Sequence, residues 1–193
     1  ISPGGLISDA ELFGNLKKDR SAMFLEGINT ILKIWSTEAP YKIKGDYWDV
    51  TTENTLIEDI GQGYMTKPFQ KPHPPIIVTA VAPYSKGVSE AAARGWKPIS
   101  ADIIMPIWVK THWEKYEEGC KKGKLMPSKD DWRIAKTVFV AEDLKKAREY
   151  ALGPNSPYVF YFKQLFKKFV ALGKLELFKS SKNQPDSEIT LEK

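Results

Sequence analysis

Apolar residues recur at helical spacing in several segments of the chain. In residues 20–36, Phe24, Ile28 and Ile31 fall on one face of a helix. Other segments show the same periodicity between Gly and Pro residues that break it. The expected helices cover residues 20–36, 85–95, 103–122 and 143–151, with a last one after Pro154. The expected loops cover residues 1–19 and 61–75, and residues 41–52 are expected to form a short extended excursion or hairpin.

Short β-branched or alternating runs predict the strands. Residues 76–81 are continuously apolar, which is typical of a parallel strand covered on both faces. Residues 97–100 predict a second short strand. Residues 132–140 predict a third, with Trp132, Ile134, Val138 and Val140 on one side.

Strands that alternate with helices indicate an α/β architecture with parallel strands. Three strands are too few for a closed barrel, and a complete (β/α)8 barrel takes about 250 residues. The chain is therefore expected to be a small open α/β domain or a piece of a barrel. It opens without Met, and residues 180–193 are polar, so both ends are interpreted as cuts through a longer protein.

Composition removes several classes of protein. The chain has 193 residues, of which 42% are hydrophobic and 27% charged, a soluble globular balance. The net charge of +5 is scattered among 24 acidic residues, which argues against nucleic acid as a partner. The single Cys120 excludes an intramolecular disulfide and is expected to be buried. Neither a signal peptide nor an apolar run of about 20 residues is present, so a cytoplasmic location away from membranes is expected.

Familiar chemical motifs do not account for the chain. It has no P-loop, no G-x-G-x-x-G motif and no Ser-His-Asp order. His73 precedes a strand and His112 lies on a predicted helix, and both are interpreted as structural. No metal site is expected, because no His, Cys and Asp cluster is present.

An ordered series of motifs carries a family resemblance. Its members are Gly45-Asp46-Tyr47-Trp48, Gln70-Lys71-Pro72-His73-Pro74-Pro75-Ile76, Ala82-Pro83-Tyr84-Ser85, Gly95-Trp96-Lys97-Pro98-Ile99-Ser100 and Asp131-Trp132-Arg133-Ile134-Ala135-Lys136. Together with residues 9–35, this series resembles the luciferase-like flavin-dependent monooxygenases over about residues 3–151. The resemblance implies a partial (β/α)8 TIM barrel with about strands 5 to 7. Residues 1–193 would be a single incomplete barrel domain, with 1–19 a loop after a missing strand 4 and 180–193 a polar insertion or cut end.

The resemblance also implies a function. The protein would be a two-component monooxygenase that uses reduced FMN, supplied by a separate flavin reductase, and O2 to oxygenate a small apolar organic substrate. A deazaflavin-dependent oxidoreductase of the same fold and a non-catalytic flavin-binding or interaction protein remain alternatives. The family's catalytic His would lie in the missing first half, so no general base is named. An incomplete barrel exposes strand edges, so a homo-oligomer is expected.

The candidate cofactor site centres on a strand-to-helix junction and an Arg. At Ser85 the free N–H groups, the helix dipole and the hydroxyl suit a phosphate, although Ser85 could instead only cap its helix. Arg20 falls where the resemblance implies a phosphate-binding Arg, and the alternative is a surface Arg that opens a helix. Gly5 and Leu6 could offer backbone N–H groups, or form a flexible end.

Residues at the predicted strand ends complete the candidate site. Barrel active sites lie at the carboxyl ends of the strands, where side chains can also simply pack in the core. The remaining cofactor-binding candidates are Thr79, Val81, Ala82 and Tyr84. The candidates for the substrate pocket are Ser100 and Ala101.

Overall fold

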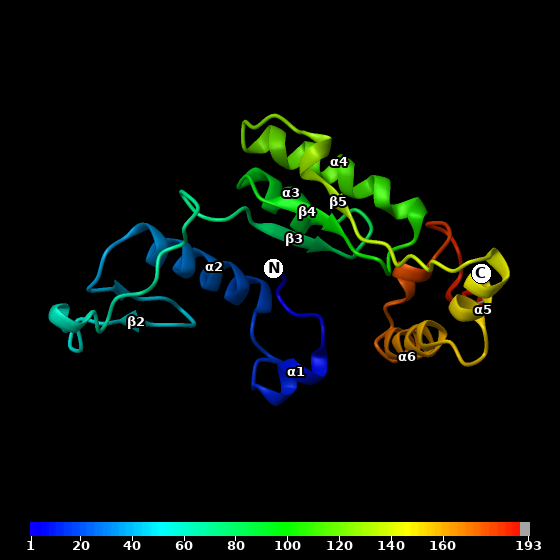
Figure 1. Ribbon diagram of the computed structural model, residues 1–193, viewed down its shortest axis with the longest axis horizontal. Coiled ribbons are helices and arrows are strands. Elements are labelled where there is room, and N and C mark those ends of the chain that lie inside the picture. The colour runs from blue at the N-terminus through cyan, green and yellow to red at the C-terminus, as the bar shows by residue number, and fades with distance from the viewer. Residues whose placement is uncertain (190–193) are drawn as a thin grey trace. The chain divides into compact units, whose positions relative to one another are not determined.

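The computed structural model describes residues 1–189, which fall into two compact units, residues 1–76 and the described residues from Ile77 onward (Figure 1). Each unit is described by itself. The first contains α1 (Ile7–Leu12), α2 (Arg20–Ser36), β1 (Lys42–Ile43), β2 (Val50–Thr51) and the 3-10 helix η1 (Glu58–Ile60). The second contains β3 (Ile77–Ala80), α3 (Lys86–Ala93), β4 (Lys97–Ser100), α4 (Pro106–Lys122), η2 (Lys129–Asp131), β5 (Arg133–Ile134), α5 (Leu144–Leu152), α6 (Pro157–Ala171), η3 (Leu175–Phe178) and η4 (Asp186–Glu188).

The boundaries of α2 agree with the prediction, because side chains satisfy both of its ends. The Asp19 carboxylate accepts the N–H groups of Ser21 and Ala22, each at 3.0 Å. At the other end, Lys67 Nζ donates to the carbonyl oxygens of Ile34, at 2.5 Å, and Thr37. These bonds satisfy backbone groups that a helix end leaves unpaired.

The prediction of a loop over residues 1–19 is wrong in part, because Ile7–Leu12 forms the short helix α1. Its N-cap residue, Leu6, makes no capping hydrogen bond through its side chain. No capping residue therefore marks the start of α1 in the sequence, whereas Pro3 and Gly4 just before it are typical of a loop. By contrast, residues 41–52 form the hairpin that was one of two expectations, with β1 antiparallel to β2.

A glutamate holds the loop between β1 and β2. The Glu26 carboxylate accepts three successive backbone N–H groups, from Asp46 at 2.9 Å, Tyr47 at 3.0 Å and Trp48 at 2.9 Å. These bonds hold the pKa of Glu26 below its usual value, against the opposing and larger single effect of desolvation. At Gly45, a Cβ would lie 2.2 Å from Glu26 Oε1, so the loop closes on the carboxylate only without a side chain there.

Unit 2 is built on a parallel sheet in the order β3-β4-β5, which confirms the α/β class. Within the described residues the sheet is open and not a closed barrel. The expectation that the first strand is covered on both faces is wrong. Val78 and Ala80 are buried, whereas Thr79 between them is exposed.

The buried face of the sheet carries the core of this unit. Ala80 packs in one cluster with Val88 and Ala92 of α3 and with Tyr116 and Cys120 of α4. Cys120 is buried, as predicted.

Two glycines let α4 pack closely on α3 (Figure 1). A Cβ at Gly119 would lie 2.2 Å from the carbonyl oxygen of Ser89 and 2.6 Å from Cβ of Ala92. A Cβ at Gly123 would lie 2.4 Å from the carbonyl oxygen of Ala93. The backbones of the two helices therefore meet where any side chain would separate them.

The predicted strand over residues 132–140 is much shorter, since only Arg133 and Ile134 pair with β4. β4 ends at Ser100, whose carbonyl still accepts the Ala135 N–H at 2.9 Å, and the described residues after Ala135 make no further backbone bond to β4. The N–H of Thr137 instead donates to the Asp102 carboxylate at 3.0 Å. Val138 and Val140, expected on one side of a strand with Trp132 and Ile134, lie outside the strand and are exposed.

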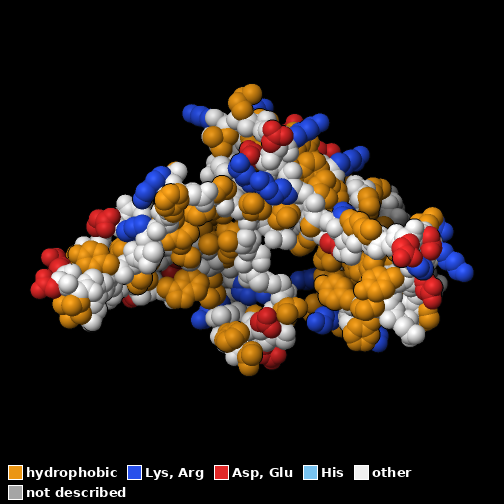
Figure 2. Space-filling view, in the orientation of Figure 1, with side chains coloured by type: hydrophobic (Ala, Val, Ile, Leu, Met, Phe, Trp, Pro, Cys, Tyr) orange, Lys and Arg blue, Asp and Glu red, His pale blue; other side chains and the backbone are white. Residues whose placement is uncertain are grey.

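The last helices present both lysines and apolar rings to the surface. Asp143 caps α5, the helix expected over residues 143–151, by accepting the N–H of Lys146 at 2.8 Å. On α6, Phe160 and Tyr161 are exposed, and Figure 2 shows hydrophobic side chains gathered over the α5 and α6 end of this unit. The lysines on and just after α6 are exposed to solvent, namely Lys163, Lys167, Lys168 and Lys174. None of the helices in residues 1–189 is both long and apolar enough to cross a bilayer.

Candidate functional site

Three segments of unit 2 follow the carboxyl ends of the parallel strands. They are residues 81–85 after β3, residues 101–105 after β4 and residues 135–137 after β5. Ligands of parallel α/β proteins bind at this edge, because the loops there converge without disturbing the sheet. These segments hold five of the ten residues expected at the site, Ser100 ends the strand before one of them, and together they form the candidate site of this unit.

The junction at Ser85 keeps hydrogen-bonding groups unused. Ser85 is the N-cap residue of α3, yet its hydroxyl makes no capping hydrogen bond. Among residues 1–189, no acceptor bonds the N–H groups of Lys86 or Gly87. The alternative in which Ser85 only caps its helix is therefore not what the structure shows. Unpaired N–H groups at a helix start and a free hydroxyl form a suitable environment for an anion.

Tyr84 is held in an unusual backbone conformation. Its φ of 51° lies in the left-handed region, which non-glycine residues seldom adopt. Its N–H donates to Thr111 Oγ1 at 3.0 Å, so this backbone group is not available to a ligand. The Tyr84 ring meets the Trp108 ring edge-on, with centroids 6.2 Å apart, and stays partly exposed. Tyr84 can therefore contact a ligand through its side chain but not through its N–H group.

Ala82 and Ser100 are joined by a buried histidine. His112 Nε2 lies 2.9 Å from the Ala82 carbonyl oxygen, and its Nδ1 lies 2.8 Å from Ser100 Oγ. Trp132 Nε1 donates to the same Ser100 Oγ at 2.9 Å. Ser100 and His112 are both 0% exposed. The structure thus places the hydroxyl of Ser100 against α4, where His112 and Trp132 use it, and confirms His112 as a packed helix residue.

Burial lowers the pKa of His112, and the hydrogen bond to the Ala82 carbonyl opposes this effect in part. The neutral imidazole therefore predominates at neutral pH. A neutral ring has one donor and one acceptor nitrogen, which matches its two partners.

The remaining candidates at the strand ends have varied surroundings. Thr79 is exposed on β3 and Val81 is exposed just after it. Ala101 is half-buried, and its N–H donates to the Ala80 carbonyl at 2.9 Å, which extends the pairing of β3 and β4. Their contacts with a cofactor or substrate stay predictions.

A cavity of about 250 Å³ opens beside the segments that follow β4 and β5. Its lining includes Asp102, Lys136 and Tyr158 with the rings of Phe162 and Phe178. Two charged groups of the wall, Asp102 and Lys136, are already engaged. The Asp102 carboxylate accepts from Thr137, and Lys136 Nζ donates to the carbonyl oxygens of residues 102 and 104, at 2.8 and 3.0 Å.

Tyr158 contributes a phenol to the wall of this cavity. Desolvation first, and then the charge of Asp102, raise the pKa of the phenol. The Tyr158 side chain therefore stays protonated at neutral pH. The sequence did not single out this cavity, because α6 and the segment from Phe178 to Glu188 join its wall only through the tertiary fold.

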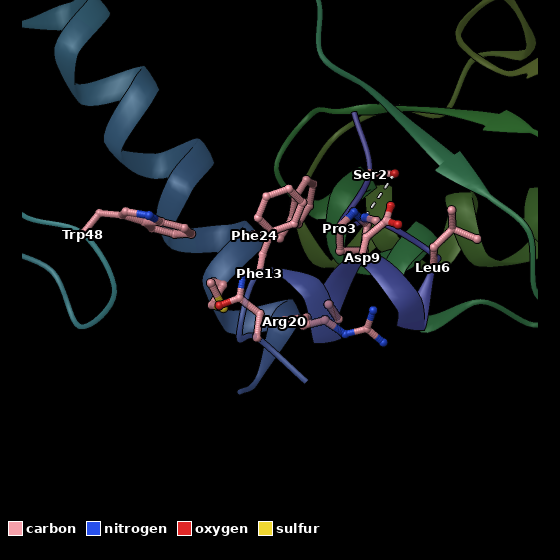
Figure 3. A pocket seen from close by; sticks show the side chains of 12 residues that line it. Ser2, Pro3, Leu6, Asp9, Phe13, Arg20, Phe24 and Trp48 are labelled. Atoms are coloured by element: carbon pink, nitrogen blue, oxygen red, sulfur yellow. Dashed lines mark hydrogen bonds between the residues drawn. The ribbon is translucent and has the colours of Figure 1, made fainter. Parts of the chain in front are cut away.

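Unit 1 has a second cavity of about 250 Å³ beside Arg20. Its lining includes Gly4, Leu6, Asp9 and Phe24 but not Gly5, and Figure 3 shows Arg20 at the start of α2 with Asp9 and Leu6 nearby. Within the described part of the chain, the Arg20 guanidinium makes no ion pair or hydrogen bond. An anion bound here would depend on that guanidinium, because Asp19 already occupies the first amides of α2.

The predicted phosphate residues thus divide between the two units. Arg20, Gly5 and Leu6 belong to unit 1, and Ser85 with its neighbours belongs to unit 2. Each group has unused donors within its own unit. Among residues 1–189, no cluster of three or more His, Cys, Asp or Glu side chains is arranged to hold a metal ion.

Comparison with known proteins supports the fold. No protein-family model and no curated protein matches the chain. The FMN complex of the oxygenating constituent of 3,6-diketocamphane monooxygenase from Pseudomonas putida, a type II Baeyer-Villiger monooxygenase, matches 98% of the chain with a TM-score of 0.75 and 23% identity. Monooxygenase RslO1 from Streptomyces bottropensis matches 92% of the chain with a TM-score of 0.66 and 16% identity.

The chain spans about half of each of these proteins, 52% of the first and 51% of the second. At these identities the likeness concerns the fold. The chain thus shares its fold with about half of each of these two monooxygenases, and its own described residues close no barrel.

Proposed function

We propose that the chain is part of a two-component flavin-dependent monooxygenase of the luciferase-like type. Reduced FMN comes from a separate flavin reductase, and the enzyme uses it with O2 to oxygenate a small apolar organic substrate. When bound in reduced form, FMN activates O2 so that one oxygen atom passes to the substrate. The chain itself contributes residues that bind and orient the cofactor.

One observation carries the proposal. The fold of almost the whole chain matches a protein whose structure contains FMN and which is the oxygenating constituent of a monooxygenase. A second monooxygenase shares the fold over 92% of the chain. Fold alone does not determine chemistry, so the site must also suit the cofactor.

The residues present suit the phosphate of FMN. Ser85 offers a hydroxyl that no helix amide uses, and Lys86 and Gly87 offer unpaired N–H groups. Arg20 offers a guanidinium without an acidic partner in the described structure. Hydroxyl, amide and guanidinium donors are those that phosphates prefer in proteins. We assign the phosphate to Ser85 and the amides that follow it in unit 2, and we keep Arg20 of unit 1 as a predicted cofactor ligand in its own right.

The test compares two flavins that differ only in the phosphate. Binding of reduced FMN and reduced riboflavin is measured anaerobically by equilibrium dialysis for the wild-type protein, Ser85→Ala and Arg20→Ala. A hydrogen bond to a charged group contributes about 1.5–3 kcal/mol, so each variant should bind reduced FMN about tenfold more weakly or worse. The affinity for riboflavin should not change.

Matched controls come from residues away from both cavities. Ser187→Ala and Arg148→Ala remove the same groups from exposed positions and should leave both affinities unchanged. Equal loss of both flavins in Ser85→Ala and Arg20→Ala, or no loss of either, contradicts the phosphate assignment. If the wild-type protein binds a deazaflavin more tightly than FMN, the proposed monooxygenase function is wrong and a hydride-transferring oxidoreductase is favoured in its place.

A further inference from the structure

Two adjacent buried polar residues of α4 bond the backbone of the turn formed by residues 81–85. Thr111 is 1% exposed and bonds the N–H of Tyr84, and His112 is 0% exposed and bonds the carbonyl of Ala82. Burying polar side chains costs free energy unless they find partners. An apolar pair at positions 111 and 112 would pack on the sheet without needing hydrogen-bond partners. The bonds that Thr111 and His112 make to the turn therefore indicate a role beyond packing.

The donors and acceptors at His112 are fixed from both ends. The Trp132 indole can only donate, so Ser100 Oγ accepts from it at 2.9 Å. The Ala82 carbonyl can only accept, so His112 Nε2 carries the hydrogen of that 2.9 Å bond. The Ser100 hydroxyl then donates to His112 Nδ1 at 2.8 Å. Every group in this chain is satisfied, and the imidazole has one orientation and one tautomer.

Thr111 is fixed in a similar way. Its hydroxyl donates its only hydrogen to the Trp108 carbonyl at 2.6 Å, one turn earlier in α4. A lone pair of Thr111 Oγ1 is then the acceptor for the Tyr84 N–H at 3.0 Å. This bond holds Tyr84 in its left-handed conformation, directly before the N-cap residue Ser85.

We propose that Thr111 and His112 are positioning residues, which hold the turn at residues 81–85 so that Ser85, Lys86 and Gly87 keep their donors free for an anion. This inference rests on the proposed flavin phosphate site. Neither residue touches the phosphate. His112 fixes the carbonyl at the start of the turn and Thr111 fixes an amide near its end, so the backbone between them cannot rotate to satisfy the amides of α3 internally.

The experiment separates positioning from packing with paired substitutions. Thr111→Val keeps the shape of the side chain and removes the acceptor, and Thr111→Ser restores the acceptor. His112→Leu removes the donor to Ala82, and His112→Gln keeps an N–H donor. Affinities for reduced FMN and reduced riboflavin are measured together with urea denaturation, so that only folded variants are compared.

We expect Thr111→Val and His112→Leu to weaken reduced FMN binding about tenfold with riboflavin binding unchanged, and Thr111→Ser and His112→Gln to recover most of the loss. Amide exchange at Tyr84 should become faster in Thr111→Val without any flavin. If His112→Leu does not fold, the isosteric Thr111→Val decides the question alone.

Two failures can be told apart. If the wild-type protein prefers FMN to riboflavin and loses that preference in Ser85→Ala, but folded Thr111→Val keeps it, the positioning inference is overturned and the phosphate site stands. If the wild-type protein does not prefer FMN, the phosphate site fails and this inference fails with it. Equal weakening of both flavins in Thr111→Val also overturns positioning, because it indicates general damage to the fold.

Discussion

Gly119 lies where α4 meets α3, and the structure leaves no room there for a methyl group. In Gly119→Ala, the new Cβ would lie 2.2 Å from the Ser89 carbonyl oxygen, 2.9 Å from its carbonyl carbon and 2.6 Å from Cβ of Ala92. Side-chain Cβ atoms essentially never approach within 3.0 Å, so α4 must retreat from α3 by about 0.8 Å. The first contact is with backbone, which cannot rotate aside as a side chain can.

The cost follows from the packing that this movement disturbs. The cluster of Ala80, Val88, Ala92, Tyr116 and Cys120 lies between α3, α4 and the sheet. Inserting a methyl group into a packed interior costs about 1–3 kcal/mol, and the rigid neighbour favours the upper end. Ala has a better helix propensity than Gly by about 1 kcal/mol, which offsets part of the cost. We expect a net loss of about 2 kcal/mol from the free energy of unfolding of this unit.

Urea denaturation followed by tryptophan fluorescence, with hydrogen exchange of peptides from α3 and α4, measures this loss. Gly87→Ala is the matched control, because a Cβ there would lie 3.6 Å from Ser85 Oγ, an ordinary contact. Its stability should equal or slightly exceed that of the wild-type protein. A Gly119→Ala protein that unfolds at the wild-type urea concentration, with unchanged exchange in α4, would refute the close-packing argument.

Two further predictions concern charged side chains. Lys115 and Lys122, each 2.6 Å from Glu118, lower the pKa of Glu118 from 4.5 to about 2. The contribution of the Glu118 carboxylate to the free energy of unfolding is therefore complete above its unfolded-state pKa, and it is lost as the pH falls from 4.5 toward 2. The melting temperature of the wild-type protein should therefore fall more steeply with pH over that window than that of Glu118→Gln. Parallel plots of melting temperature against pH for the two proteins would contradict the assignment. Lys67→Met keeps the aliphatic stem but loses the bonds to the end of α2 and to the Tyr41 hydroxyl. It should destabilise unit 1 by about 1–3 kcal/mol, with faster exchange in the last turn of α2, whereas unchanged exchange there would show that the cap is dispensable.

Local signals made much of the fold predictable. α2 begins where Asp19 supplies a cap, and α5 begins after Asp143 for the same reason. β3 and β4 were found because short β-branched or apolar runs stand between Gly and Pro residues. These features need only a few neighbouring residues, so a single sequence displays them.

Features that depend on a partner were not predictable. The alternation in residues 132–140 suits a strand, but β4 offers backbone partners only as far as the Ala135 N–H, and the chain then turns to Asp102. The coverage of β3 was also overestimated, since an apolar run does not say how many faces a sheet will cover. The length of β5 is set by the backbone hydrogen bonds that β4 can offer, and not by the hydrophobic pattern of residues 132–140.

In the candidate site, too, features set by neighbouring residues could be predicted, and features that depend on distant partners could not. A hydroxyl at a strand-to-helix junction can be recognised from sequence, and this brought attention to Ser85. The support from α4 could not be recognised, because His112 lies 30 residues from Ala82 and 12 residues from Ser100. Its pattern on α4 is that of any buried helix residue, and only the folded backbone reveals what it bonds.

The loop held by Glu26 links two positions of the chain that can change only together. A side chain at residue 45 would meet both the Glu26 carboxylate, at 2.2 Å, and the Trp48 carbonyl oxygen, at 2.8 Å. Shortening residue 26 alone would leave three backbone N–H groups without their acceptor. Each single substitution therefore meets a barrier, so a change at residue 26 or at residue 45 alone is disfavoured, and this keeps the hairpin tied to α2.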